Sequence, residues 1–238
     1  MPIQTLTAGS RVMARAARRF ADRANVLDDP LRLGGFNVEQ WVISEELVDC
    51  ALTAVVCSQA TVEASINELF TQGIINDAEH WFAGLDPKIA KNLHTAWPDL
   101  ERARIEDKIS EAARIADFRT FTFGAGAAQQ LTKLVILRNV LVHSAPEWVE
   151  LKGVGAQSGD PLERCLGTSF PRARIWQSRK AAYQWDGCLG GPCAVWAYNT
   201  AVAFLGEFFR GLGTGYPAEH SKIIPLEGSS DPGAGSTC

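Results

Sequence analysis

One apolar helix near the middle of the chain constrains the fold most strongly. Residues 131–148 read LTKLVILRNVLVHSAPEW, and this density of Leu, Val and Ile is typical of a helix that is buried on most sides. Three polar residues, Arg138, Asn139 and His143, stand in its last two turns. Polar groups in apolar surroundings cost free energy unless each finds a partner, so these three need a structural or a chemical role. Pro146 predicts the end of the helix, because the residue before a proline is disfavoured in the α region.

The rest of the chain also favours helices. Residues 9–25 start with Ser10, a good N-cap residue, and continue in helix formers. A long helix is predicted from Ser44 to a stop near Gly73, because its apolar residues recur at i, i+3 and i+4. A short helix around residue 87 should break at Trp97-Pro98, and residues 99–117 and 193–211 should form two more helices. Residues 28–43 read as a loop.

The fold expected from this pattern is all-α, because no stretch alternates in the way that strands do. We expect an up-and-down bundle of four to five helices, with a long irregular insertion before the last helix. The chain divides into three parts: a basic N-terminal helix and loop (1–43), the bundle with the irregular loop 150–176 (44–213), and a Gly-, Ser- and Pro-rich tail that should be disordered (214–238).

The composition excludes several classes of protein. The chain has 238 residues, 46% of them hydrophobic and 21% charged, as in an ordinary soluble globular protein, and its formal net charge of −4 gives no global attraction to nucleic acid or to anionic membranes. Its six cysteines lack the spacing of a disulfide framework or a zinc site, so neither a metal nor another cofactor is expected. No signal-like segment and no apolar run of about 18 residues is present. We therefore expect a cytoplasmic protein without a membrane partner.

Two local regions are nevertheless basic. Residues 9–25 place several arginines at helical spacing, which fits a solvated helix face or a contact with nucleic acid. Residues 164–185 mix cations with aromatic side chains, a combination that suits a single-stranded nucleic acid, where phosphates pair with cations and bases stack on rings. The plainer interpretation is an arginine-rich surface around aromatic anchors. The candidate RNA-binding residues are Arg164, Arg172, Arg174, Arg179, Lys180 and Trp176.

Helical geometry raises a difficulty for the three polar residues. At about 100° per residue, Asn139 and His143 lie within roughly 40° of each other, whereas Arg138 lies about 140° from His143. The Arg138 side chain could wrap around the helix, the helix could loosen before Pro146, or a second copy of the chain could supply the missing group. Thr132 falls on the same line as Asn139 and His143. Glu63 and Asn67 are either surface residues or supporting groups that reach toward this end of the helix.

The pattern Arg-Asn-x-x-x-His at the end of an apolar helix, here LRNVLVH followed by SAPEW, resembles the HEPN superfamily. The segment SQATVEASINELF also looks like the second helix of such bundles. The resemblance covers roughly residues 44 to 145, with 193–211 as a closing helix. It does not explain the first 43 residues, the basic loop or the tail.

The resemblance implies a four- to five-helix bundle and a metal-independent endoribonuclease, often a toxin or defence effector. His143 would take the proton of the 2′-hydroxyl or protonate the leaving 5′-oxygen, and Arg138 would stabilise charge on the phosphate. Asn139 would fix the orientation of His143 or of the phosphate. The products would end in a 2′,3′-cyclic phosphate. The implied partners are RNA, a second copy packed through the end of the 131–143 helix, and an antitoxin or regulatory protein. The alternative is a non-catalytic binding or scaffold module for RNA or protein.

Overall fold

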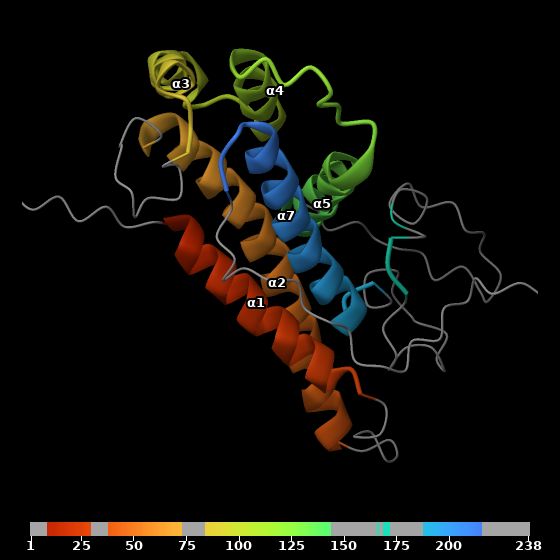
Figure 1. Ribbon diagram of the computed structural model, residues 1–238. Helices are drawn as coiled ribbons and strands as arrows, with labels where there is room; N and C mark the ends of the chain where they lie inside the picture. Colours follow the sequence, from red (N-terminus) through yellow and green to blue (C-terminus); the bar gives the residue numbers. More distant parts are fainter. Residues whose placement is uncertain are drawn as a thin grey trace, which may run out of the picture.

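The computed structural model describes residues 9–29, 38–72, 84–143, 166, 169–171 and 188–215. This part of the chain forms six α-helices and contains no strand, which confirms the all-α prediction for the residues described (Figure 1). The helices keep the labels of Figure 1, and their bounds are α1 (Gly9–Leu27), α2 (Val38–Gln72), α3 (Pro87–Leu100), α4 (Ile105–Ile115), α5 (Gly126–His143) and α7 (Gly191–Gly211).

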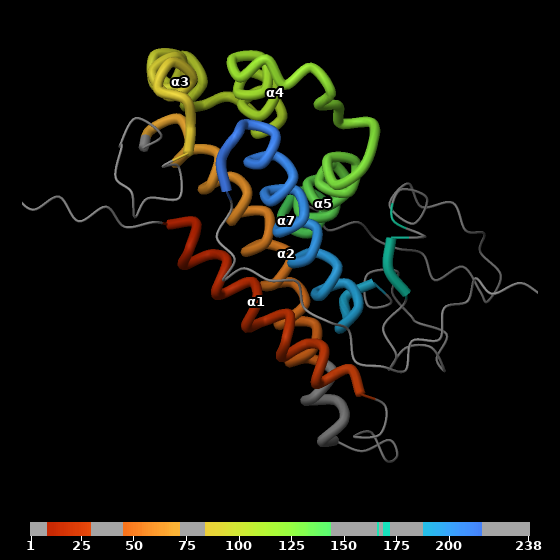
Figure 2. The backbone as a smooth tube through the Cα atoms, in the orientation of Figure 1, coloured from red at the N-terminus to blue at the C-terminus, as the bar shows by residue number. Residues whose placement is uncertain are grey.

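Four of the helices pack side by side, two running in each direction. Ser10 at the start of α1 contacts Glu68 near the end of α2, so these two helices are antiparallel. Gly191 at the start of α7 donates its backbone N–H to Asp28, just after α1, so α7 also runs against α1. α5 runs against α7, because Gly126 lies beside Glu207. α2 and α7 are therefore parallel and lie between α1 and α5, as the tube in Figure 2 shows.

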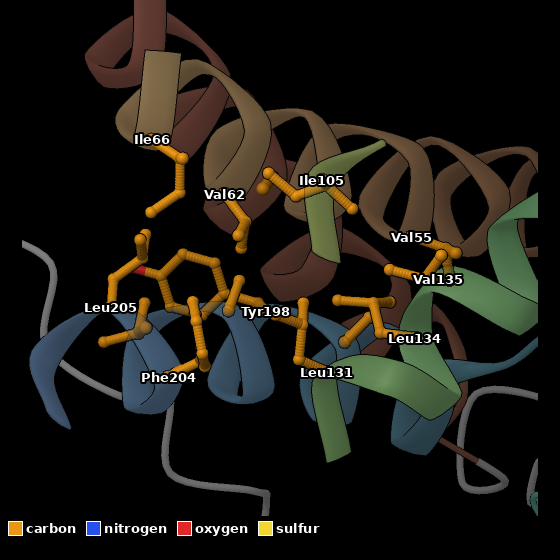
Figure 3. Packing of buried hydrophobic residues seen from close by; sticks show 14 of the residues in the cluster. Val55, Val62, Ile66, Ile105, Leu131, Leu134, Val135, Tyr198, Phe204 and Leu205 are labelled. Carbon is orange, nitrogen blue, oxygen red and sulfur yellow. The ribbon is translucent and has the colours of Figure 1, made fainter. Parts of the chain in front are cut away.

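α7 is the most enclosed of these helices, and it rather than α5 lies at the centre. Most of its side chains are buried between α1, α2 and α5. Figure 3 shows Tyr198, Phe204 and Leu205 of α7 pointing toward Val62 and Ile66 of α2. Burial of one such side chain stabilises the fold by about 1.5–3 kcal/mol. The contact between α7 and α2 therefore contributes much of the stability of the core.

α1 packs closely on its neighbours through small side chains. Ala14, Ala17, Ala21 and Ala24 follow an i, i+3, i+4 pattern and are all buried. At the far end the backbones nearly touch, since a Cβ on Gly191 would lie 2.9 Å from the Cα of Asn25. The predicted boundary between residues 43 and 44 lies inside α2. α1 also shares one hydrophobic core with α2 and α7.

α3 and α4 cover the end of the bundle where α2 and α7 finish (Figure 1). The buried side chain of Lys108 joins these helices to α2. Its Nζ donates to Asn67 Oδ1 at 2.8 Å and to the Glu101 carbonyl at 3.1 Å, and it lies 5.2 Å from the centroid of the Trp97 ring. A buried cation is tolerated when it is paired in this way.

Several predicted boundaries are wrong, each for a local reason. α2 begins at Val38, so the loop predicted for residues 28–43 is helical in its last six positions. α3 continues through Pro98 to Leu100, because a proline in the last turn leaves only an exposed carbonyl without its partner. α4 consequently begins at Ile105 and not at residue 99. α7 starts two residues earlier than predicted, with Pro192 in its first turn.

One stretch of α2 also satisfies the length and composition of a membrane span. Residues Glu45–Thr71 have a mean hydropathy of 1.3 over the most apolar window, and half of that window is buried inside the bundle. This is weak evidence, because the core helix of a soluble protein passes the same test.

The N-terminus of α1 is capped by a carboxylate from another helix. Glu68 is only 6% exposed, and it accepts hydrogen bonds from Ser10 N at 2.9 Å and from Ser10 Oγ at 2.6 Å. Ser10 is therefore inside the helix and is not its own N-cap. Burial raises the pKa of Glu68, and the hydrogen bonds from Ser10 offset only part of that shift.

We expect Glu68→Gln to change how stability depends on pH. Because the pKa of Glu68 is raised in the folded state, its contribution is full below the ordinary pKa of glutamate, about 4.3. That contribution is lost as the pH rises through the folded value. A glutamine keeps an acceptor for the backbone of Ser10 and carries no charge. Urea unfolding should thus show the variant gaining on the wild type as the pH rises above the ordinary pKa of glutamate, about 4.3.

The matched control is Glu63→Gln, which changes an exposed acid five residues earlier on the same helix. It should leave the pH profile of the wild type almost unchanged. A parallel profile for Glu68→Gln and the wild type would contradict the proposed role of the buried charge. Glu68→Ala removes the acceptor of both Ser10 hydrogen bonds and should cost about 1–3 kcal/mol near pH 4, where the contribution of Glu68 is full.

Candidate functional site

The last three turns of α5 have one open face. Ile136 and Val142 are 38% and 46% exposed, and Asn139 and His143 are exposed beside them. The prediction that this helix is buried on most sides is therefore wrong for its outer face. The opposite face does enter the core, where Leu131, Leu134 and Leu137 are fully or almost fully buried.

Arg138, Asn139 and His143 meet within one chain. Nη1 of Arg138 donates to Asn139 Oδ1 at 3.0 Å and lies 3.3 Å from His143 Nε2. The guanidinium wraps around the helix to make both contacts, which was one of the three solutions left open by helical geometry. A guanidinium can only donate, so its contact with Nε2 is a hydrogen bond when the imidazole is neutral and carries its proton on Nδ1.

The three residues form an incomplete network. Arg138 is half-buried, and its Nε is buried without a hydrogen-bond partner among the described residues. An unsatisfied buried donor costs about 1–3 kcal/mol. A purely structural trio would be sealed from solvent and fully hydrogen-bonded. This one is open at Asn139 and His143 and still has an unused donor.

The predicted supporting residues do not join this cluster. Thr132 Oγ1 donates to the Ala128 carbonyl of its own helix at 3.2 Å. Glu63 is exposed and accepts from Gln59 at 3.1 Å. Asn67 accepts from Lys108 at the opposite end of the bundle. All three residues lie on helices, as predicted, but their hydrogen-bond partners lie outside the cluster of Arg138, Asn139 and His143.

A second polar group on α5 was not predicted. Gln130 accepts from Trp196 Nε1 of α7 at 3.2 Å, and Lys133 Nζ donates to Ser169 Oγ at 3.0 Å. Phe170 packs against Trp196 in a tilted arrangement, with 5.0 Å between the ring centroids. These contacts attach residues 169–170 to the surface of α5 and α7. For Phe170 the contact agrees with an aromatic anchor, although no sequence pattern predicts Trp196 as its partner.

The remaining predicted residues do not extend the site. Arg164, Arg172, Arg174, Trp176, Arg179 and Lys180 all lie outside the described residues. Within the described part of the chain, no three side chains of His, Cys, Asp or Glu are placed to hold a metal ion. Cys50 is buried and Cys57 half-buried, and burial raises the pKa of both thiols, which makes them poor nucleophiles.

Comparison with models of known protein families, with curated proteins and with solved structures found no match for this chain. The likeness to the HEPN superfamily thus depends on the Arg138-Asn139-x-x-x-His143 motif and its helical setting alone.

Proposed function

We propose that this chain is a metal-independent endoribonuclease of the HEPN type, with Arg138, Asn139 and His143 as its catalytic residues. One observation supports the proposal above the others. The three side chains are in contact within one chain, yet Asn139 and His143 are exposed to solvent and Arg138 is only half-buried. A site that must bind a phosphate and move a proton needs this combination of connection and access.

The contacts suggest a sequence of steps for the reaction. A phosphodiester that approaches Arg138 offers better acceptors than the imidazole, since charge-assisted bonds to phosphate are short and strong. Nη1 then turns from His143 to the phosphate, and the lone pair on Nε2 becomes free. Nε2 takes the proton of the 2′-hydroxyl while its oxygen attacks the phosphorus. The bond to the 5′-oxygen breaks and that oxygen takes a proton from water, so the products carry a 2′,3′-cyclic phosphate and a 5′-hydroxyl. The imidazolium of His143 then returns its proton to the solvent.

We further propose that the chain acts in the cytoplasm on cellular RNA, as a toxin or defence effector held in check by an antitoxin or regulatory protein. The open face of α5 would then pack against a second copy. Ile136 and Val142 support this, because they are two of the four large hydrophobic side chains exposed in the described part of the chain. The second copy is no longer needed to bring Arg138 to His143.

The experiment is to incubate the purified chain with a mixed RNA in excess EDTA and to identify the ends of the products. The proposal expects cleavage with 5′-hydroxyl and cyclic phosphate ends, and no cleavage of DNA with the same sequences, because DNA lacks the attacking hydroxyl. Absence of cleavage across several structured and unstructured RNAs would reject the nuclease and favour a binding module.

A further inference from the structure

The outer face of α1 carries a row of arginines that the bundle does not use for packing. Arg11, Arg15 and Arg19 are all exposed and follow one another at i, i+4 and i+8. Each step rises about 6 Å along the helix and turns by about 40°, so the three side chains form one continuous row. The buried alanines lie on the opposite side of the helix.

Two other arginines of α1 have acidic partners, whereas the centre of the row has none among the described residues. Arg18 pairs with Asp22 at 3.8 Å, and Arg23 pairs with Glu46 of α2 at 2.7 Å. Arg15 and Arg19 form no ion pair with any described residue. Like charges four residues apart destabilise a helix by about 0.2–0.5 kcal/mol, so the fold alone gives no reason for this pair. In a chain with a net charge of −4, they are a local concentration of positive charge.

We propose that this row, centred on Arg15 and Arg19, binds the phosphodiester backbone of RNA. Every cation of α1 is an arginine, whose planar guanidinium matches two phosphate oxygens at once. An anionic membrane fits less well. A helix that lies on a membrane inserts its own apolar face, and α1 uses that face in the core. Only Val12 and Met13 remain as large hydrophobic side chains exposed on α1.

This surface is separate from the end of α5. Figure 1 shows α1 and α5 on opposite flanks of α2 and α7. The row therefore holds RNA without touching Arg138 or His143, and it would serve a binding module as well as a nuclease. Its substrate contact is to phosphates and carries no base preference of its own.

The test is the binding of a fluorescent, fully 2′-O-methylated single-stranded RNA to the full chain, measured by anisotropy over a range of salt concentrations. This RNA lacks the hydroxyl needed for cleavage, so binding and catalysis can fail separately. Arg15→Gln/Arg19→Gln removes the centre of the row. Lys88→Gln/Lys91→Gln removes two exposed cations from α3 and is the charge-matched control.

Two lost phosphate contacts should weaken binding about 25-fold near 0.1 M salt and lower the salt slope by about 1.4. The control should bind like the wild type. Equal weakening by both double variants would reduce the effect to net charge and overturn the proposal. The proposal is also overturned if the wild type does not bind this RNA. It is overturned too if the arginine variant still binds RNA and loses only its binding to phosphatidylserine vesicles. Unchanged circular dichroism and thermal midpoint show that both variants are folded.

Discussion

His143→Ala should lower the rate of RNA cleavage by about 10³-fold, because positioned proton transfer contributes about 10²–10⁴-fold to such reactions. The loss should appear in kcat, with little change in KM, since an imidazole that moves a proton acts mainly in the transition state. The side chain is exposed, so its removal leaves no cavity in the core. The measurement is initial cleavage rate against RNA concentration, in EDTA.

The chain offers a matched control in His94, an exposed histidine on α3. His94→Ala should cleave RNA at the rate of the wild type. If His143→Ala also kept that rate, His143 would not be the acid or base. If both variants lost activity together, the cause would be stability or a contaminating nuclease. Repeated purification tests for a contaminating nuclease. The activity of the wild type is its own if it stays constant while the residual activity of His143→Ala falls.

The all-α class of fold could be predicted from the sequence, because most of the helices are recognisable by their apolar periodicity. The i, i+3, i+4 pattern located the bodies of α2 and α7. The ends of the helices were harder. Pro98 predicts a break, but it lies in the last turn of α3 and the helix continues through it to Leu100. The start of α2 at Val38 was missed although Asn37, a favourable N-cap residue, directly precedes it in the sequence and Gln40 follows three residues later.

Partners across the fold were beyond the reach of sequence patterns. Helical spacing placed Glu63 and Asn67 on α2, but spacing does not tell which neighbouring helix a side chain meets. Asn67 meets Lys108, and the cap of α1 comes from Glu68, an acid with no distinguishing pattern around it. Burial of a charged residue depends on packing between helices distant in sequence.

The same limit explains the trio on α5. Ideal helical geometry set Arg138 about 140° away from His143, which is correct for the directions of their Cα–Cβ bonds. It does not describe where a long flexible side chain ends. The guanidinium group sits at the end of several rotatable bonds, and it reaches Asn139 and His143 together. The Arg-Asn-x-x-x-His motif can be recognised in the sequence. The contact of its three side chains within one chain cannot be predicted from the sequence.

Arg138→Ala should lower RNA cleavage by roughly 10²–10³-fold, the usual loss when one donor to a developing anion is removed. Arg138→Lys should recover only part of it, because a single ammonium cannot hold Asn139 and the phosphate with a planar fork. Arg102→Ala, at an exposed arginine before α4, is the control and should retain full activity. Rates are compared in EDTA on the same RNA.

Mixing Arg138→Ala with His143→Ala then decides whether one site uses one chain or two. If a site took Arg138 from one copy and His143 from the other, a mixed dimer would contain one intact site, and activity would return. The 3.0 Å and 3.3 Å contacts within one chain predict no recovery at any mixing ratio. Light scattering on the same samples reports whether dimers are present. A monomer that cleaves RNA leads to the same conclusion, whereas recovery to a substantial fraction of wild-type activity would show that the partner completes the site.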